Sequence, residues 1–599
     1  MTTITWTGAL SGEWGVAENW SPSSVPGASD TAVFGTANNG NTTITFSAPQ
    51  RVSTVEFTAN APIYQFLFGT QPTPPPGNPY EIWLTICDSV VNHSGNSQHF
   101  TVKATGTSYK TPELAFSGTA GAGGADVYYY SGPDDTAQIG GGNITFFGTS
   151  TAQEANFTIK SGQNYNGGQV GAEVTFWEWA TAGEALFTIY GGTGTAHYGF
   201  ANAVFHENSN AGGATFIVKG GTLPGNDGGN AQFYGNTSAA GGCFHNHGAT
   251  YVSSQEPSDA NPWSNGGDTA FDGTGNGGAG QFINYAGACM GSYGGVTSFN
   301  NNPNYGDNGS GDGASAGGGL YLNYGAQVGE GGGGHVKFTS QYGNPKGGQA
   351  TIVNYGSETS FSASAGYTLF YTSSTDYYPT AEQANITNNP AASKEGWGGK
   401  TAFSNYTKAE EVTENTLIPT AGNAWINNLG GNSEGMGGGY TEFGSNTTVG
   451  SATLIAACGY QGGYGGSIKF FEGAQGSTTC TITLAGNGTE QENGTLSLTS
   501  RTSPLTVGTL NINGGGTIDS AVGSEGTSEV IVTNPVTITG TLHFNFTRSG
   551  SLATGTPYAV LSTTNLTSAD EDKISGYLDG YQTSFSISNG IVSVTFSNA

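Results

Sequence analysis

Hydrophobic and polar residues alternate along most of this chain. The alternation is clear in Val52–Phe57 (VSTVEF), in Phe157–Ile159 and in Ile591–Phe596 (IVSVTF). Successive side chains of an extended strand point to opposite faces, so this pattern predicts strands with one buried face. Val, Ile, Thr, Tyr and Phe dominate these runs, and Gly-Gly, Asn-Gly and Gly-Asn pairs separate them, as is typical of strands joined by turns. The pattern predicts an all-β fold.

The middle of the chain contains an internal repeat of 28 to 30 residues. Its anchors are the aromatic residues Phe146, Phe176, Phe205 and Phe233. A second Phe follows each anchor eleven residues later, at Phe157, Phe187, Phe216 and Phe244. Each repeat holds two short strands and a Gly-rich turn, which is too little to bury a core alone. Stacked repeats pair at about 4.8 Å and share a core, so we predict a parallel β-solenoid (β-helix) with the anchor rings stacked inside.

Stacking also predicts that equivalent positions of successive coils form ladders. The segments FINYAG, YLNYGA and IVNYGS place Asn284, Asn323 and Asn354 in equivalent sites, each followed by a Tyr. Asn246 falls at the same offset in its repeat as Asn284. Stacked amides satisfy one another's hydrogen bonds, so we predict an asparagine ladder at these positions.

The two ends of the chain differ from the repeat. Residues 1–126 contain a proline-rich loop, and residues 500–599 lose most of the Gly-Gly pairs. A solenoid has an unpaired edge at each end, so we assign residues 1–126 to an N-terminal cap and the start of the solenoid, residues 127–499 to the solenoid repeats, and residues 500–599 to a C-terminal β cap. Insertions in the body carry aromatic residues that either bind a partner or pack against the coils: Trp263, Tyr305, Tyr377, Tyr378 and Trp397.

The composition narrows the range of functions. Gly accounts for 102 of 599 residues, charged residues for 9%, and the formal net charge is −28. This charge disfavours nucleic acids and anionic membranes as partners, because both require clustered Lys and Arg. No apolar run is long enough for a membrane-spanning helix. The first ten residues lack the features of a signal peptide, so an exported form would have lost its leader. Five cysteines are too few and odd in number for a disulfide framework.

The opening of the chain carries a recognisable motif. It reads Trp6-Thr7-Gly8, Glu13-Trp14 and Asn19-Trp20-Ser21, followed by Pro26 and Asp30. It resembles the opening of large Gly-rich bacterial surface proteins with autotransporter-associated β-strand repeats, and Thr181–Gly192 is similar to their repeat. The segment from Tyr558 to Phe596 resembles the close of their passenger regions. The resemblance implies an exported, right-handed parallel β-helix with a surface or adhesive role, and it implies no catalytic residue.

Two groups of residues are candidates for metal or acid–base chemistry. Cys243, His245 and His247 alternate along one strand face, but they span about 13 Å of extended chain, so we do not expect them to share a metal ion. Glu178 and Glu207 occupy the same offset in neighbouring repeats. A carboxylate pair is used in glycoside hydrolysis or in binding calcium, and the alternative is a pair of solvated surface glutamates. We expect no enzymatic activity.

Turns rich in Asp, Asn and Gly are candidates for calcium. They occur at Gly225–Gly228, Asp307–Gly309, Asp312–Gly313 and Asp134–Asp135. Oxygen-rich turns suit this ion, whereas ordinary turns use the same residues without a ligand. We therefore expect no cofactor, with calcium as the one candidate ion.

An aromatic column is the last candidate surface. Phe147, Trp177, His206 and Tyr234 each lie one residue past an anchor. If the anchors point inward, these residues point outward and stack from coil to coil. Such flat surfaces contact sugars or another protein, or they lie beneath a loop.

Together, these features predict an exported cell-surface protein with a structural or adhesive role; the alternative is a carbohydrate-active or ligand-binding β-helix. Its partners are expected to be surface glycans, neighbouring cells or further copies of itself. Exposed strands pair readily, so polymerisation into a filament or layer through the terminal strands is one hypothesis. Its candidate residues are Thr3, Ile4, Trp6, Val592, Val594 and Phe596. In the alternative, both end strands pair within the chain as caps.

Overall fold

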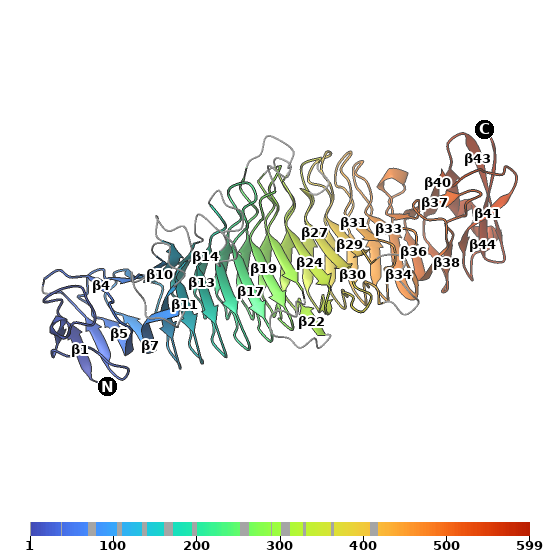
Figure 1. The fold of residues 1–599 in the computed structure, drawn as a ribbon. Coiled ribbons are helices and arrows are strands. Elements are labelled where there is room, and N and C mark those ends of the chain that lie inside the picture. Colours follow the sequence, from blue (N-terminus) through green and yellow to red (C-terminus); the bar gives the residue numbers. More distant parts are fainter. Residues whose placement is uncertain are drawn as a thin grey trace. The chain divides into compact units, whose positions relative to one another are not determined.

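The computed structural model describes thirteen segments of the chain: residues 2–37, 39–69, 80–104, 111–133, 141–160, 172–193, 201–251, 263–288, 290–300, 312–327, 331–360, 364–407 and 417–599. The chain divides into two compact units. Unit 1 comprises residues 1–282, 290–297 and 304–307, and unit 2 comprises residues 283–289, 298–303 and 308–599. Each is a stack of coils built from parallel strands, about 16 coils in all, and only 3% of the chain is helical (Figure 1). The predicted all-β parallel solenoid is confirmed.

Unit 1 carries one strand of each of two sheets in most of its coils. The strands of sheet A are β1 (Thr3–Trp6), β2 (Trp20–Ser21), β3 (Thr31–Phe34), β5 (Gln50–Phe57), β7 (Tyr80–Asn92), β9 (Thr111–Phe116), β11 (Asn143–Phe146), β13 (Glu173–Phe176), β15 (Asn202–Phe205), β17 (Asn230–Tyr234) and β19 (Asp268–Asp272). The strands of sheet B are β4 (Thr43–Thr45), β6 (Gln65–Phe68), β8 (Gln98–Ala104), β10 (Val127–Pro133), β12 (Asn156–Ile159), β14 (Leu186–Ile189), β16 (Thr215–Val218) and β18 (Cys243–Asn246). The division between the units falls within β20 (Gln281–Asn284) and β21 (Val296–Phe299).

Unit 2 has the same two sheets. Sheet A contains β24 (His335–Ser340), β27 (Tyr367–Thr372), β29 (Lys400–Asn405), β31 (Tyr440–Phe443), β33 (Ser467–Phe470), β35 (Thr495–Ser497), β37 (Gly515–Val522), β40 (Thr541–Arg548) and β42 (Ile574–Tyr577). Sheet B contains β23 (Leu320–Asn323), β26 (Thr351–Asn354), β28 (Asn385–Asn388), β30 (Trp425–Asn428), β32 (Thr453–Ala456), β34 (Ser477–Ala485), β36 (Leu505–Asn513), β38 (Val530–Val532), β39 (Thr537–Ile538), β41 (Pro557–Ser562), β43 (Tyr581–Ser588) and β44 (Ile591–Asn598). β22 (Asp312–Ser315) and β25 (Asn344–Lys346) form a small third sheet, and short 3-10 helices lie at Ala17–Asn19, Glu490–Glu492 and Ser568–Lys573.

The predicted anchors form a column of rings inside unit 1. Phe146 pairs with Phe176, which pairs with Phe205, and Phe205 pairs with Phe233. Their ring centroids lie 4.7, 4.7 and 4.5 Å apart, which is the spacing of parallel strands. The second set of Phe residues forms a matching column on sheet B. The two columns meet edge to face across the core, as at Phe146 and Phe157, a favourable aromatic geometry.

The predicted asparagine ladder lies in the core of unit 2. The side-chain amide of Asn284 donates to Asn323 over 2.8 Å, and Asn323 donates to Asn354 over 2.8 Å. The ladder continues through Asn388 to Asn428, over 2.7 Å at each step. All five side chains are fully buried. Asn246 of unit 1, one coil before Asn284 in the repeat, is also buried, and it donates to the backbone of Val296 and to the side chain of Thr297.

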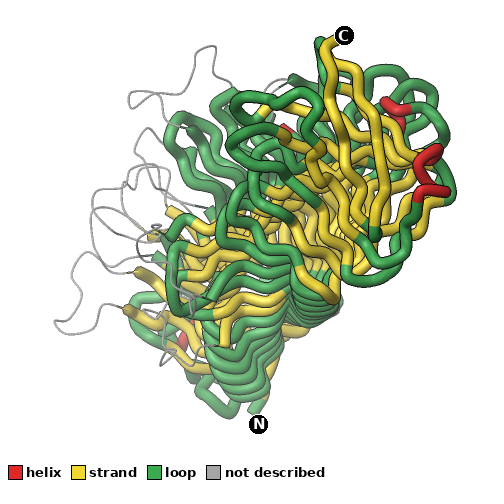
Figure 2. Tube along the Cα trace, turned by 90° about the vertical axis from the view of Figure 1, so that its right-hand side faces the viewer, coloured by secondary structure: helices red, strands yellow, loops and turns green. Residues whose placement is uncertain are grey.

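The Gly-Gly pairs have a steric role that the sequence analysis did not foresee. A Cβ atom at Gly439 would lie 2.1 Å from the carbonyl oxygen of Asn388, and one at Gly438 would lie 2.4 Å from that of Gly465. The second Gly of the pair thus lies against the end of the sheet B strand, and the first lies against the next coil. Gly is needed here because the backbones pack too closely for a side chain. Figure 2 shows the turns following one another in register along each stack.

Coils of parallel strands extend into both end regions of the chain. Parallel stacking already includes β3 and still includes β42, so much of residues 1–126 and 500–599 belongs to the solenoid. At the C-terminal end, β44 pairs antiparallel with β41 and β43. At the N-terminal end, Trp6, Trp14 and Trp20 of the recognised motif are buried together, with Trp20 centred 4.9 Å from Trp6 and 4.8 Å from Trp14.

Candidate functional site

Both terminal strands pair within the chain, as the alternative to strand-mediated polymerisation predicts. β1 pairs with β2 on one side and with β3 on the other. β44 lies between β41 and β43. The inward-facing candidates, Ile4, Trp6, Val592, Val594 and Phe596, are buried, whereas Thr3 is exposed. The buried side chains of both strands therefore belong to the core of their own units, which leaves fewer unpaired edge groups for another chain.

Three of the four members of the predicted aromatic column, Trp177, His206 and Tyr234, stack from coil to coil. Trp177 and His206 stack with ring centroids 3.8 Å apart and an interplanar angle of 10°, and Tyr234 follows at 5.4 Å from His206. Tyr234 is buried, while Phe147, Trp177 and His206 are half-buried. Burial lowers the pKa of His206 to about 4, so its ring is neutral at pH 7. The column is therefore mainly a packing feature with a narrow exposed edge.

Cys243, His245 and His247 lie along one face of β18 and just beyond it. The Sγ of Cys243 lies 3.4 Å from Nε2 of His245, and Cys243 also contacts the side chain of Gln281 at 3.5 Å. Burial and the charge of Lys219 lower the pKa of His247 to about 4. Among the described residues, no three His, Cys, Asp or Glu side chains are arranged to hold a metal ion. The four described cysteines, Cys87, Cys243, Cys458 and Cys480, are free thiols.

Glu178 and Glu207 lie on adjacent coils at the exposed tips of two turns. Both have positive φ angles, 58° and 59°, where the neighbouring coils have Gly148 and Gly235. The carboxylate of Glu178 accepts a hydrogen bond of 2.6 Å from the backbone N–H of Gly148. This contact compensates for the unfavourable backbone conformation and gives Glu178 a structural role in its turn.

The predicted calcium turns are only partly described. In Gly225–Gly228, Asp227 accepts a hydrogen bond of 2.6 Å from the side chain of Asn265, so this turn is tied to the next coil. Asp134, Asp135 and the run from Asp307 to Gly309 lie outside the described residues.

Of the aromatic residues in the insertions, Trp263 stacks on Tyr293 at 4.6 Å, and the backbone N–H of Tyr378 donates to Asn344. Tyr305 lies outside the described residues, while Tyr377 is half-buried and accepts a hydrogen bond from Thr372.

Trp397 belongs to a groove of about 520 Å³ on unit 2, which we call the Trp397 groove. The groove lies over three successive turns that lead from sheet B to sheet A, at residues 389–399, 429–439 and 457–466. Backbone hydrogen bonds join neighbouring turns, as from Ala391 to Gly437 and from Tyr464 to Met436. The groove is therefore built on stacked coils and not on one isolated loop.

The shape of the groove depends on one position in each of the three turns, the residue just before the Gly-Gly pair. In the three turns this residue is Trp397, Gly437 and Tyr464. The outer two are exposed, at 41% for Trp397 and 49% for Tyr464. A Cβ atom at Gly437 would meet nothing within 4 Å. Two aromatic residues thus flank a position without a side chain, two coils or about 10 Å apart.

Polar groups complete the lining of the Trp397 groove. The indole N–H of Trp397 donates to the carbonyl of Ser360 over 2.8 Å, which holds the ring in place. The ammonium group of Lys469 lies 4.5 Å from the ring centre of Tyr440 and 3.4 Å from Glu442. Burial and the charge of Glu442 raise the pKa of Tyr440, so its hydroxyl stays protonated.

The arrangement is suited to binding a neutral or weakly charged sugar. Flat rings pack on the C–H faces of a sugar, while ammonium and hydroxyl groups bind its oxygens. Among the described lining residues Glu395 carries the only carboxylate, whereas glycoside hydrolysis uses a pair. Sequence reasoning named Trp397 but missed the groove. The sequence feature that could have revealed the groove is the series Trp-Gly-Gly, Gly-Gly-Gly and Tyr-Gly-Gly, which precedes three successive strands of sheet A.

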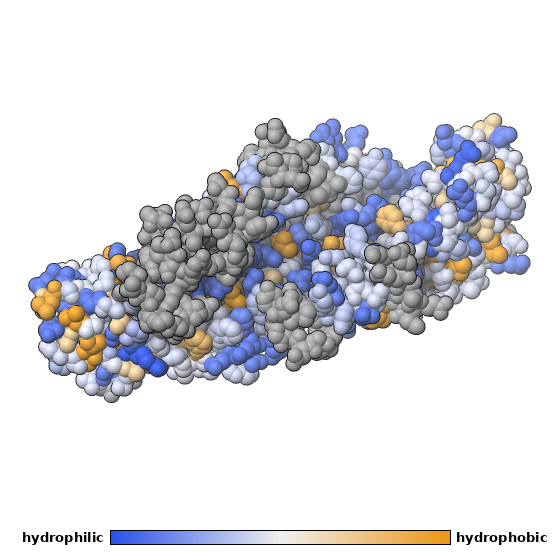
Figure 3. Space-filling model, in the orientation of Figure 1, coloured by the Kyte–Doolittle hydropathy of each residue, from blue (hydrophilic) through white to orange (hydrophobic). Residues whose placement is uncertain are grey.

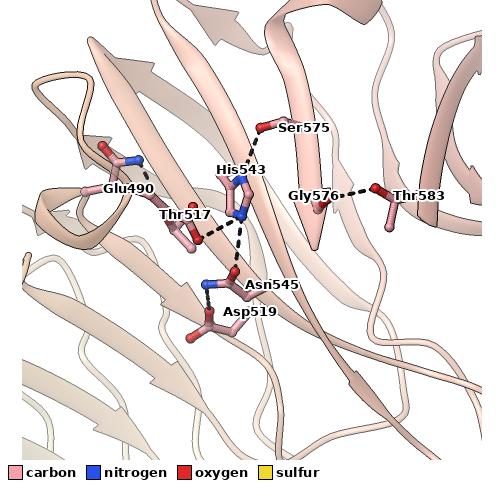
Figure 4. A network of polar contacts seen from close by, with 9 residues as sticks. Glu490, Thr517, Asp519, His543, Asn545, Ser575, Gly576 and Thr583 are labelled. Carbon is pink, nitrogen blue, oxygen red and sulfur yellow. Dashed lines mark hydrogen bonds and ion pairs between the residues drawn. The ribbon is translucent and has the colours of Figure 1, made fainter. Parts of the chain in front are cut away.

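A polar network on sheet A of unit 2 is a second cluster of reactive groups (Figure 4). His543 of β40 contacts Ser575 through Nδ1 at 2.9 Å and Glu490 through Nε2 at 2.9 Å. Asn545 also contacts Nε2, at 3.1 Å, and donates to Asp519 over 3.2 Å. A serine hydroxyl beside a histidine that also contacts a carboxylate is the arrangement that activates serine as a nucleophile in some enzymes. However, Ser575 lies within a parallel strand, directly opposite His543, so the network also joins neighbouring coils.

No protein-family model matches the chain, and no curated protein sequence is similar to it. No helix among the described residues has the length and hydrophobicity required to cross a membrane. On the face drawn in Figure 3, hydrophobic residues form small patches among hydrophilic ones.

Proposed function

We propose that this protein is an exported cell-surface protein with a structural or adhesive role, and that it contacts surface glycans through the Trp397 groove. The observation that carries the glycan contact is the pair of exposed rings, Trp397 and Tyr464, on either side of Gly437. Aromatic side chains that line a binding surface often supply much of its binding energy. The function is binding without catalysis, which accords with the single carboxylate of the lining.

The cell-surface location rests on the resemblance of the N-terminal motif to passenger-type surface proteins and on a fold compatible with that family. The low Lys and Arg content, 14 residues in 599, also leaves few sites for proteases that cleave after basic residues. Polymerisation through the terminal strands is not part of the proposal, because both strands are paired within the chain.

The glycan contact is tested with immobilised oligosaccharides. We expect the protein to retain at least one of them, and Trp397→Ala to weaken that binding about tenfold. Gly437→Leu should abolish it, because its Cβ atom would meet nothing within 4 Å and the rest of the side chain would occupy space between the rings. Trp179→Ala is the matched control, since Trp179 is 64% exposed in unit 1 and lies outside the groove. Equal losses in the three variants, or no binding to any oligosaccharide, would refute the glycan contact.

The location is tested separately, by labelling cells that express the protein with an antibody against it. We expect intact and lysed cells to be labelled equally. Labelling that requires lysis would overturn the cell-surface assignment and would leave the groove experiment unaffected.

A further inference from the structure

The outward face of sheet B in unit 1 has an unusual charge pattern. The six strands β8, β10, β12, β14, β16 and β18 contain no Asp or Glu, although the chain has 42 acidic residues. Their side chains alternate between the core and solvent, so that Phe157 is buried while Asn156 and Thr158 are partly exposed. The solvent-facing side of these strands therefore lacks the negative charge found elsewhere on the chain.

Lysines form a regular row along one margin of this face. Lys103 is paired with Gly132 of β10. Ser131 is paired with Ile159, so Lys160 lies beside Gly132 on the following coil. Backbone hydrogen bonds from Tyr190 to Ile159 and from Lys219 to Ile189 place Tyr190 and then Lys219 on the next two coils. Lysines thus recur at every second coil, a spacing of about 10 Å.

Tyrosine rings hold two of these lysines in position. The Nζ of Lys103 lies 5.6 Å from the ring centre of Tyr130, and that of Lys160 lies 6.0 Å from Tyr130 and 5.1 Å from Tyr190. No salt bridge to a carboxylate of the described residues is formed by Lys103, Lys160 or Lys219. A cation held on aromatic faces keeps its charge available to a ligand. Among the described residues, the row therefore presents three lysines at fixed intervals that form no ion pair with a carboxylate.

We propose that the row of Lys103, Lys160 and Lys219, with Tyr130 and Tyr190 between them, binds a linear polysaccharide that carries carboxylates and lies along the stack of coils. Evenly spaced cations match a polymer with evenly spaced anions, and the intervening rings offer flat surfaces to its sugars. The net charge of −28 does not prevent this contact, because exposed charges are screened over about 8 Å at physiological salt. The inference extends the proposed glycan binding to a second surface and does not depend on the groove.

The probe is polygalacturonate, and the comparison is the same polymer with its carboxylates methyl-esterified. We expect the protein to bind the acidic polymer and not the ester, with an affinity that falls as salt rises. The variant K103Q/K160Q/K219Q should bind at least about tenfold more weakly, since each exposed ion pair contributes modestly. K337Q/K346Q/K573Q removes the same charge elsewhere and should bind as the parent does.

Three results would overturn this proposal. The first is equal binding of the acidic and esterified polymers, and the second is an equal loss in both triple variants. The third is failure to bind polygalacturonate together with low-salt self-association that K103Q/K160Q/K219Q abolishes, because the occupant would then be the acidic surface of a second copy. Gly437→Leu separates the two sites, since it should leave polygalacturonate binding unchanged while it blocks the Trp397 groove.

Discussion

The side-chain amide of Asn354 donates a hydrogen bond of 2.7 Å to the side-chain oxygen of Asn388, one coil further along unit 2. The same Asn354 accepts from Thr368 over 3.0 Å and donates to the carbonyl of Lys400 over 3.0 Å. The interior amide is thus satisfied on all sides, which buried polar groups require. In unit 1 the equivalent core position holds Ile159, Ile189 and Val218. The coil therefore accepts either an aliphatic column or a continuous amide ladder.

A substitution in the middle of the asparagine ladder should destabilise the protein more than one at its end. We expect Asn354→Leu to destabilise the surrounding coils by about 3 kcal/mol, because Asn323, Asn388 and Thr368 each lose a buried partner. Hydrogen exchange of the amides in β23, β26 and β28 measures this effect locally, as a stacked array need not unfold in one step. Asn428→Leu is the control, because it ends the ladder and removes fewer bonds. Equal losses in both variants would contradict a cooperative ladder.

Substitution by alanine should affect stability very differently at Gly439 and at Gly437, which lie two residues apart in the same turn. Gly439→Ala would place a Cβ atom 2.1 Å from the carbonyl of Asn388, whereas one at Gly437 would meet nothing within 4 Å. We therefore expect Gly439→Ala to disrupt its coil or prevent folding, and Gly437→Ala to remain within about 0.5 kcal/mol of the parent. Thermal unfolding and protease resistance compare the two. Similar behaviour of both would show that the turn can shift to admit a side chain.

His335 should make unit 2 less stable in mild acid. It is buried and stacked 4.4 Å from Tyr367, and burial together with the nearby Lys337 lowers its pKa from 6.5 to about 4. The unfolded chain takes up the proton first, so the stability that depends on neutral His335 is complete above pH 6.5 and is lost as the pH falls toward 4. The full loss is about 3 kcal/mol.

The measurement is the pH dependence of hydrogen exchange in β24 and β27. His335→Phe should flatten it between pH 6.5 and 4, while the control His93→Gln, at a histidine side chain 58% exposed, should not. A profile unchanged by His335→Phe would mean that other groups cause the acid sensitivity.

Ser575 should not behave as a catalytic nucleophile. Its contact with His543 is short, but an acyl-transfer site also needs N–H donors directed at the developing oxyanion, and the surrounding backbone is paired in register with β40. We expect a fluorophosphonate probe to leave the folded protein unlabelled. Stoichiometric labelling that is lost in Ser575→Ala would reverse this assignment and make the chain a hydrolase.

The sequence by itself determined the repeating architecture. Alternation fixed the strands, and the spacing of Phe146, Phe176, Phe205 and Phe233 fixed the coil length. The Asn and aromatic ladders followed directly, because parallel stacking in register places equivalent residues on top of one another. These features are periodic, and periodicity can be read along a single chain.

Only the tertiary structure decided which residues face a partner. The terminal strands look like exposed edges in the sequence, yet β44 lies between two strands, and β1 pairs with β3 and, at Thr5 and Trp6, with β2. The Trp397 groove depends on a missing side chain at Gly437 between rings on flanking coils. The lysine row likewise depends on register across insertions of unequal length, which brings together Lys103, Lys160 and Lys219. Local sequence carries no record of such lateral neighbours, because they are set by how the coils stack.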